Sequence, residues 1–198
     1  MNPVVEALAR AVRDLTVINA RWALVGGFAV SAWADPRFTR DVDLCIAVDD
    51  DQQAEQVVAA MRARDYRIET IIEHEWVQRL ATVRLSLPAL GGVVVDLLFA
   101  SSGIEPEIVQ SAGVIEIMPG VLAAVARPPH LVVLKLLART ERRPQDAADL
   151  VALRPLLAPA DEAEVLRLAH LVTTRGFHRD RDVFGLAHAY LAGNATAD

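Results

Sequence analysis

The chain has 198 residues, of which 53% are hydrophobic and 23% charged, a composition that excludes disorder over most of its length. The single cysteine, Cys45, excludes a disulfide framework and a Cys-rich zinc site. The formal net charge of −6 argues against a broad surface that grips nucleic-acid phosphates, but it leaves room for a local basic pocket.

Up to about residue 127, the hydrophobic pattern predicts strands interspersed with helices. In chain order we expect a helix at 4–19, a strand at 22–25, a helix at 28–34, a strand at 41–48, a helix at 51–64, strands at 66–72, 82–87 and 93–100, and a hairpin of strands 114–118 and 121–125 around Pro119-Gly120.

After Pro128-Pro129 the pattern becomes helical, with prolines or a glycine between the segments 130–140, 145–156, 160–173 and 182–191. This order predicts an α+β fold with a mixed sheet and flanking helices over residues 1–127. We expect residues 128–198 to form a helical C-terminal region packed on that sheet domain.

The chain shows no sign of membrane targeting. Its first residues carry charges every few positions and lack the apolar core of a signal peptide. The longest apolar runs, such as 131–138, are too short to cross a bilayer. We therefore expect a soluble cytoplasmic protein with no membrane partner.

Gly26 and Gly27 lie between a predicted strand and a predicted helix. Glycine lets the backbone turn tightly there and lets a ligand approach the amide groups. The N-terminus of the following helix offers N–H groups that suit a phosphate. The alternative is a plain turn without a ligand.

Asp41 and Asp43 are two residues apart on a predicted strand, so both carboxylates face the same side. Their Cα atoms are expected about 6.5–7 Å apart, which allows both to converge on one hard cation. Magnesium, which prefers oxygen ligands, is the natural occupant. The alternative is a solvated strand end with two unrelated acids.

Asp96 lies within the apolar run Gly91–Ala100, where an ionised carboxylate is costly without a partner. It could pair with one of the many arginines. A metal ion already held by Asp41 and Asp43 explains it better, because three carboxylates can hold two divalent ions for displacement at phosphorus.

The order and spacing of these features resemble a known superfamily. A Gly-Gly turn, a gap of thirteen residues, an Asp-x-Asp strand and a later strand aspartate are typical of nucleotidyltransferases of the DNA polymerase beta type. The segments Val25–Trp33 and Arg37–Leu44 are similar to AbiEii and related toxin-type nucleotidyltransferases, in which the pattern R-x-T-x-D-x-D-L recurs. Lys135–Arg139 and Asp146–Leu150 resemble a helical motif of the same family.

The resemblance implies a role for each matching residue. Gly26 and Gly27 would cradle the nucleotide phosphates through backbone N–H groups. Asp41 and Asp43 would hold two Mg²⁺ ions, and Asp96 would bind the catalytic ion and help to activate the attacking hydroxyl.

Basic and hydroxyl side chains would assist. The resemblance implies that Arg37 and Thr39 contact the triphosphate or order the loop before the strand. Lys135, the only lysine among 20 basic residues, would reach the triphosphate as a point charge. Its replacement by alanine is therefore expected to weaken nucleotide binding much more than stability.

Arg139, Asp146 and Asp149 are supporting candidates. The two aspartates lie three residues apart on one predicted helix face. An alternative is that they only anchor helices, through Arg139, Arg142 or Arg143.

Together these features predict a Mg²⁺-dependent nucleotidyltransferase that binds an NTP such as ATP, transfers a nucleoside monophosphate to an acceptor hydroxyl and releases pyrophosphate. The toxin-like motif favours a tRNA end or a protein as acceptor and implies an antitoxin partner. A small-molecule acceptor such as an antibiotic is an alternative. So are a non-catalytic nucleotide-binding module of the same fold and an interaction protein whose acids are merely solvated.

Overall fold

The computed structural model describes residues 2–140 and 143–193. Its elements in chain order are α1 (Pro3–Val17), β1 (Trp22–Val25), α2 (Gly26–Trp33), β2 (Asp41–Ile46), α3 (Asp51–Arg62), β3 (Arg67–His74), β4 (Arg79–Leu87), the 3₁₀ turn η1 (Pro88–Leu90), β5 (Val93–Leu98), α4 (Glu105–Ser111), β6 (Gly113–Met118), β7 (Val121–Val125), α5 (Pro128–Ala138), α6 (Pro144–Leu153), the 3₁₀ turn η2 (Arg154–Leu156), α7 (Pro159–Thr174) and α8 (Val183–Leu191).

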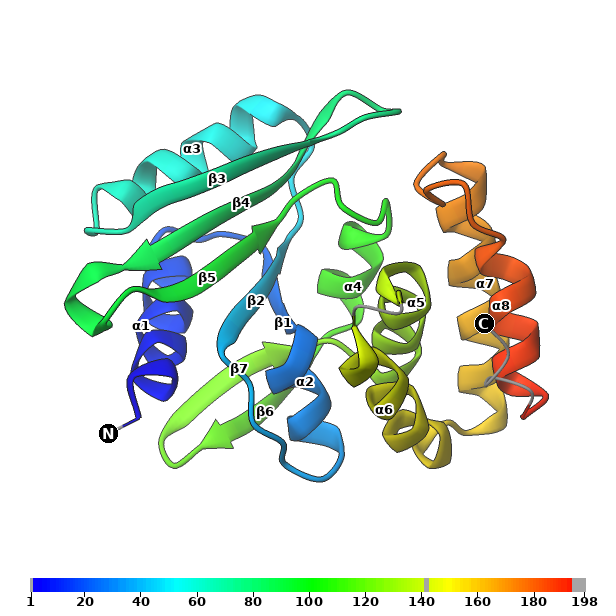
Figure 1. Ribbon diagram of the computed structural model, residues 1–198. Coiled ribbons are helices and arrows are strands. Elements are labelled where there is room, and N and C mark those ends of the chain that lie inside the picture. The colour runs from blue at the N-terminus through cyan, green and yellow to red at the C-terminus, as the bar shows by residue number, and fades with distance from the viewer. Residues whose placement is uncertain (1, 141–142, 194–198) are drawn as a thin grey trace.

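The strands form one mixed sheet in the order β3-β4-β5-β2-β1-β7-β6 (Figure 1). The pairs β2–β5 and β1–β7 are parallel, and the other neighbours are antiparallel. This arrangement confirms the predicted α+β fold, in which a mixed sheet with flanking helices precedes a helical C-terminal region.

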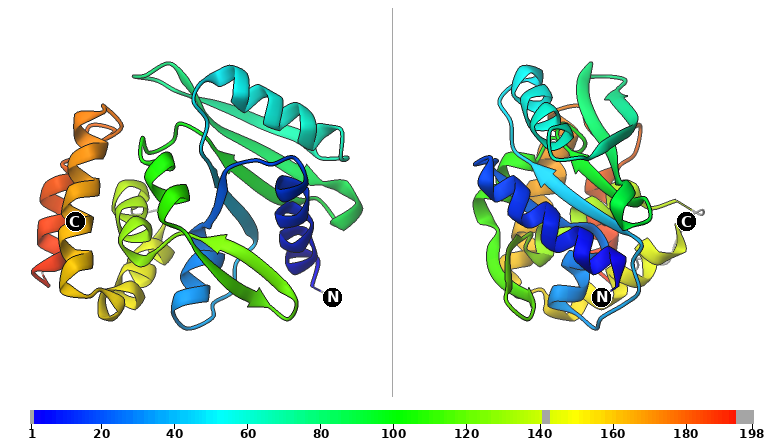
Figure 2. Two further views of the ribbon diagram at one scale, coloured as in Figure 1. Left: turned by 180° about the vertical axis from the view of Figure 1, so that it is seen from behind. Right: turned by 90° about the vertical axis from the view of Figure 1, so that its left-hand side faces the viewer.

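One face of the sheet is covered by helices from the N-terminal half of the chain. α1 packs against β2 and β5, and α3 packs against β4 (Figure 2). Alternation in β2 explains the packing, since Val42 and Leu44 are fully buried while Asp41 and Asp43 are only partly buried. The same alternation turns the two carboxylates away from the α1 side of the sheet.

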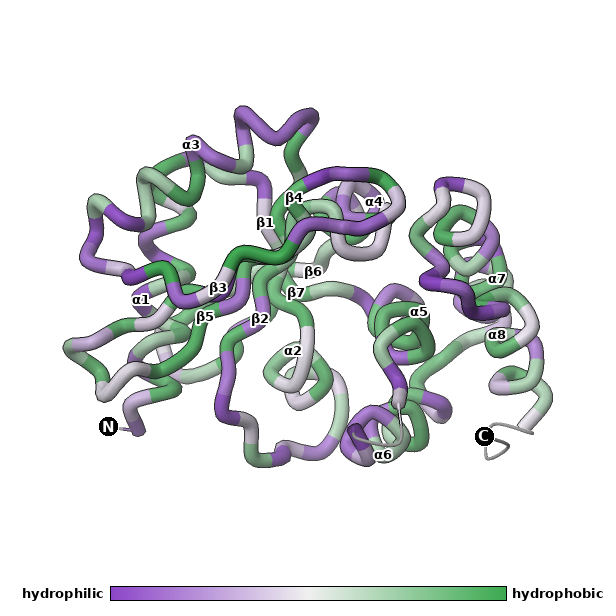
Figure 3. Tube along the Cα trace, turned by 45° about the horizontal axis from the view of Figure 1, so that its top comes forward, coloured by the Kyte–Doolittle hydropathy of each residue, from purple (hydrophilic) through white to green (hydrophobic). Residues whose placement is uncertain are grey.

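The helices α5 to α8 collect beyond one end of the sheet (Figure 1). α5 is hydrophobic over most of its length, and Figure 3 draws it largely in green. It contacts α6, α7 and α8, which lie around it, and it also contacts α2. The helical region therefore surrounds α5, and α5 carries Lys135 toward the sheet domain.

The sequence pattern missed α4, which follows β5. This helix has only seven residues, too few for a 3.6-residue period to be recognised, and proline occupies its first turn. Glu105 opens it, and the Glu105 carboxylate accepts hydrogen bonds from Ser101 N at 2.9 Å and from Ser102 N at 2.6 Å. These bonds fix the loop that leaves the end of β5.

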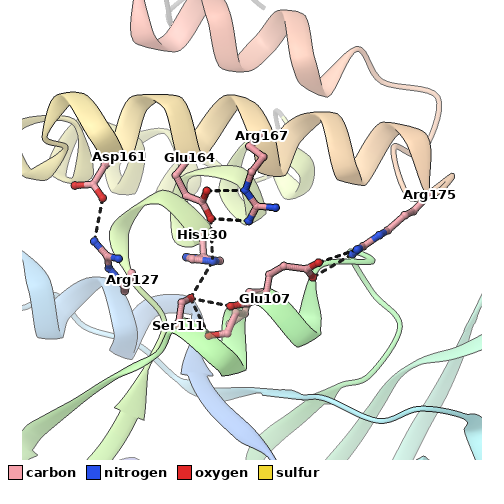
Figure 4. Close-up of polar contacts among 9 residues, drawn as sticks. Glu107, Ser111, Arg127, His130, Asp161, Glu164, Arg167 and Arg175 are labelled. Carbon is pink, nitrogen blue, oxygen red and sulfur yellow. Dashed lines mark hydrogen bonds and ion pairs between the residues drawn. The ribbon is translucent and has the colours of Figure 1, made fainter.

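A polar cluster joins α4, α5 and α7 on the side that Figure 4 shows. Ser111 Oγ lies 3.0 Å from His130 Nε2, and Glu164 Oε1 lies 4.0 Å from the same nitrogen. His130 Nδ1 is buried without a partner in the described residues. Because serine and glutamate share one ring nitrogen, this cluster lacks the relay geometry of a Ser-His-acid triad.

Burial lowers the pKa of His130 to about 4. That value includes the raising effect of Glu164 and Glu107 and the lowering effect of Arg127 and Arg167. The folded protein thus leaves His130 neutral at a pH where the unfolded chain, with a histidine pKa near 6.5, already binds a proton.

This difference predicts a loss of stability in acid. As pH falls from about 6.5 to about 4, His130 should contribute a loss of about 3 kcal/mol in the free energy of unfolding. His130→Gln cannot bind that proton, so its unfolding free energy should fall less over the same range. Urea unfolding of both proteins at several pH values measures the difference, and identical pH profiles would contradict the assignment.

Among the helices of the described residues, none combines the length and the apolar character needed to cross a membrane.

Candidate active site

The Gly-Gly turn lies directly against the acidic strand. Val25, the last residue of β1, lies opposite Asp43 of β2. Gly26 follows Val25 directly and therefore lies beside Asp43. Gly26 has φ +64°, and a Cβ built on it would lie 1.9 Å from Asp43 Oδ2. A Cβ on Gly27 would lie 2.9 Å from both Arg37 Nη2 and Thr39 Oγ1. Only glycine therefore fits at either position without movement of a predicted site residue.

Gly26→Ala tests this close approach. The left-handed backbone and the clash with Asp43 should together lower the free energy of unfolding by 2 kcal/mol or more, on the order of the combined strain terms. Gly91→Ala is the matched control, because Gly91 has φ +71° and no atom within 4 Å of a built Cβ. Its cost should be about 1 kcal/mol. Equal costs in chemical denaturation would show that the contact with Asp43 is unimportant.

Asp43 and Asp96 are direct partners in the parallel pair β2–β5, and Asp41 lies opposite Val94 two positions earlier. Both strands of this pair contribute to a cavity of about 290 Å³. Its lining includes five of the predicted site residues, namely Gly26, Asp43, Asp96, Lys135 and Asp146. The apolar part of the lining comes from β1, β3, β5 and α5, at Val25, Ile72, Leu98, Leu131, Leu134, Leu137 and Ala138.

Asp96 is held by an arginine that the sequence analysis did not identify. Arg84 of β4 pairs with Asp96 in the antiparallel register, and its Nε and Nη2 donate to the two carboxylate oxygens at 2.9 and 2.7 Å. The sequence-based alternative, in which Asp96 pairs with an arginine, is therefore realised in this conformation. A signal was available, because Arg84 interrupts the apolar strand segment between Val83 and Leu85.

Asp43 lies in a negative environment. Its pKa is raised to about 6, first by burial and then by the charge of Asp96, with a smaller contribution from Asp41. Lys135 and Arg143 act in the opposite direction without cancelling the effect. A cation near these carboxylates would relieve their mutual repulsion.

Lys135 does not present a free ammonium group to the cavity. Its Nζ lies 2.7 Å from Asp146 Oδ1 and 2.8 Å from Asp149 Oδ2, and its side chain is only 12% exposed. Arg37 completes the network, with Nε and Nη2 donating to the two oxygens of Asp149 at 2.6 and 2.7 Å. We call these four residues the ion network.

The ion network bears on two sequence-based expectations. Asp146 and Asp149 do anchor helices, and the ion pairs that do so run to Lys135 and Arg37. Of the three arginines proposed for that role, Arg142 lies outside the described residues, and Arg139 caps the end of α5. The network also gives a reason to expect a loss of stability when Lys135 is replaced, because that change would leave Asp146 without its cation and Asp149 with Arg37 alone.

Arg37 and Thr39 order the loop that leads into β2. Arg37 N donates to Ser31 Oγ at 3.2 Å, and Thr39 Oγ1 donates to the carbonyl of Asp41 at 3.3 Å. Both side chains lie against Gly27, but neither lines the cavity. Of the two roles open from the sequence, these contacts agree with ordering of the loop.

The donor set suits magnesium, because Asp41, Asp43 and Asp96 supply hard carboxylate oxygens on adjacent strands. In the part of the chain that the structure describes, no three His, Cys, Asp or Glu side chains are arranged as a complete metal site. The bidentate contact with Arg84 engages both oxygens of Asp96. The three side chains are thus of the chemical type that binds a hard cation, but in this conformation they do not form a complete site and Arg84 occupies Asp96.

Comparison with known families decides the assignment. The sequence model described as "Nucleotidyl transferase AbiEii toxin, Type IV TA system" matches residues 8–195. The chain belongs to the AbiEii family. It is therefore a nucleotidyltransferase, as the Gly-Gly turn and the Asp-x-Asp strand predicted.

Solved structures agree at the level of the fold. An antigenic nucleotidyltransferase-like protein from Paracoccidioides brasiliensis shares 21% identity, with 93% of this chain and 90% of that chain covered and a TM-score of 0.53. The solution structure of the antibiotic-resistance factor ANT(2'')-Ia shares 15% identity, with 98% and 95% covered and a TM-score of 0.50. None of the curated proteins matches the AbiEii-family chain by sequence.

Proposed function

We propose that this AbiEii-family enzyme transfers a nucleoside monophosphate from an NTP to an acceptor hydroxyl in a Mg²⁺-dependent reaction that releases pyrophosphate. The observation that supports this most is the pairing of Asp43 with Asp96 on parallel strands, beside Gly26 and within one cavity. Carboxylates in that arrangement suit displacement at phosphorus.

The chain's own residues would position the nucleotide. The α2 N-terminus has no side-chain cap, so the N–H groups from Gly26 onward are available to phosphate oxygens. Gly26 and Gly27 let those oxygens approach the backbone closely. The ion network holds α5 and α6 against the loop that contains Arg37, and so maintains the wall of the cavity opposite β2.

Asp41, Asp43 and Asp96 would hold the magnesium ions. Bound Mg²⁺ would neutralise charge on the phosphates and lower the pKa of the attacking hydroxyl. Asp96, once parted from Arg84, would accept the proton of that hydroxyl or orient it for attack. Arg84 would stay nearby as a positive charge for the leaving pyrophosphate.

We infer that the acceptor is a tRNA end or a protein and that the enzyme acts as the toxin of a toxin–antitoxin pair, with an antitoxin as its partner. Membership of the AbiEii family, whose description is that of a toxin, supports this inference.

A small molecule is the second candidate acceptor. The formal net charge of −6 disfavours a long RNA footprint.

Incubation with α-labelled NTPs, Mg²⁺ and three acceptor classes separates these candidates. Total tRNA, a protein extract and a panel of aminoglycosides are tested in parallel, with Asp43→Asn as the inactive control. We expect label in the tRNA or the protein fraction. Label in the aminoglycosides alone would transfer the assignment to the second candidate, and thermal stabilisation by Mg-NTP without any transfer would indicate a non-catalytic nucleotide-binding module.

A further inference from the structure

Two arginines line the cavity in addition to Arg84 and were not among the predicted site residues. Arg143 comes from the segment before α6, and Arg179 from the turn between α7 and α8. Both residues are exposed as a whole, although the guanidinium group of Arg179 is partly buried, and Asp43 and Asp96 line the same cavity from the sheet. The cavity therefore has an acidic sheet side and a basic side contributed by the helical region.

The other cations near the cavity already hold carboxylates. Lys135 holds Asp146 and Asp149, and Arg84 holds Asp96. Within residues 2–140 and 143–193, no carboxylate lies within ion-pair distance of Arg143 or Arg179. These two arginines are thus the cavity cations whose charge no carboxylate of the described chain neutralises by direct contact.

Arg179 is held in place by neutral partners. Its Nη2 donates to Ser101 O at 2.8 Å and to Ser101 Oγ at 3.2 Å. Ser101 belongs to the loop after β5 that the carboxylate of Glu105 fixes. Since these contacts use one guanidinium nitrogen, the others remain able to donate to a ligand.

The charges around Arg179 favour an incoming anion. Its pKa is lowered by burial of the guanidinium and by the positive charges of Arg143 and Arg181, and Glu105 offsets this only in part. Like charges gathered at one rim repel each other until a negative group comes between them. Guanidinium groups bind phosphate oxygens through charge-assisted hydrogen bonds, often two at a time.

We propose that Arg143 and Arg179 together bind a phosphate group of the substrate at the rim of the cavity. This inference rests on the proposed function, because it assigns a place to one part of that reaction's substrates. The phosphate belongs either to the triphosphate of the NTP or to the backbone of an RNA acceptor. In both cases the helical C-terminal region contributes directly to substrate binding.

Binding measurements without turnover test the proposal. Calorimetric titrations with ATP, tripolyphosphate, AMP and a short oligoribonucleotide are made on the wild type, Arg143→Gln, Arg179→Gln and the double variant. Arg21→Gln is the control. Arg21 forms an exposed ion pair with Asp49 and is not part of the cavity lining. Melting temperatures confirm that each variant is folded.

We expect Arg179→Gln to weaken binding of ATP and tripolyphosphate about tenfold or more, with the double variant weaker still and AMP little affected. Weaker binding of the oligoribonucleotide with unchanged ATP would assign the phosphate to the acceptor. Unchanged affinity for every probe, or no binding of any probe by the wild type, would overturn the proposal. Loss of label transfer is scored separately, so binding without transfer would contradict the proposed function alone.

Discussion

Asp43→Asn should abolish nucleotide transfer and leave the metal-free protein as stable as the wild type or slightly more stable. The carboxylate is destabilised by burial and by the charge of Asp96, and its pKa is raised accordingly to about 6. Removing the charge should raise the free energy of unfolding by up to about 1 kcal/mol. The same change removes a ligand for the cation, so transfer of labelled NTP should fall by about 1,000-fold or more.

Asp49→Asn is the matched control for this change. Asp49 lies just beyond the same strand, in an exposed ion pair with Arg21 that has an N–O distance of 2.8 Å. Its replacement should leave transfer unchanged, because the residue lies outside the cavity lining. A destabilised Asp43→Asn protein that still transfers label would show that Asp43 is structural.

Lys135→Met should cause a large loss of stability. The change leaves Asp146, which is 2% exposed, without its cation, and it leaves Asp149 with Arg37 alone. Asp146 Oδ2 already has no hydrogen-bond partner in the described residues. Breaking one partner out of a buried ion network costs about 3–5 kcal/mol, and denaturant unfolding should show a loss of that size.

A second substitution separates the structural effect from a role in binding. Adding Asp146→Asn to Lys135→Met removes the stranded charge and should restore part of the lost stability. Arg21→Met, which breaks an exposed pair, should cost no more than about 1 kcal/mol. If the free energy of unfolding of Lys135→Met stays within about 1 kcal/mol of the wild-type value and the variant only loses affinity for NTP, the main role of Lys135 is in binding and not in the ion network.

Local sequence pattern was sufficient to predict most of the elements and the core of the site. Alternation in β2 indicated that Asp41 and Asp43 face one side, and the apolar run around Asp96 indicated a neighbouring strand. The pairing of Asp43 with Asp96 confirms that β2 and β5 are adjacent. The structure adds a steric reason for glycine at positions 26 and 27, because a Cβ at either position would clash with a neighbouring side chain. The family pattern alone does not supply that reason.

The ion-pair and hydrogen-bond partners that the sequence did not predict depend on contacts between distant segments. Arg37 and Asp149 are 112 residues apart, and no periodicity in either segment indicates that they meet. Arg84 reaches Asp96 only because β4 and β5 pair in one particular register. Arg179 enters the cavity because the turn after α7 folds back to Ser101, 78 residues earlier. Partners of this kind follow from topology, so the sequence predicted which strands and turns meet at the cavity more reliably than what each residue contacts.

We propose that the enzyme transfers the nucleotidyl group of an NTP in the cavity beside Asp43 and Asp96. The most direct test compares α-labelled with γ-labelled ATP in the presence of Mg²⁺ and whichever of the tRNA, protein or aminoglycoside acceptors becomes labelled in the first assay. The expected result is transfer of the α-label to the acceptor, with the γ-label released in pyrophosphate and none of it on the acceptor. Asp43→Asn should transfer neither label and release no pyrophosphate. Transfer of the γ-label, or transfer of the α-label that survives in Asp43→Asn, would contradict the account.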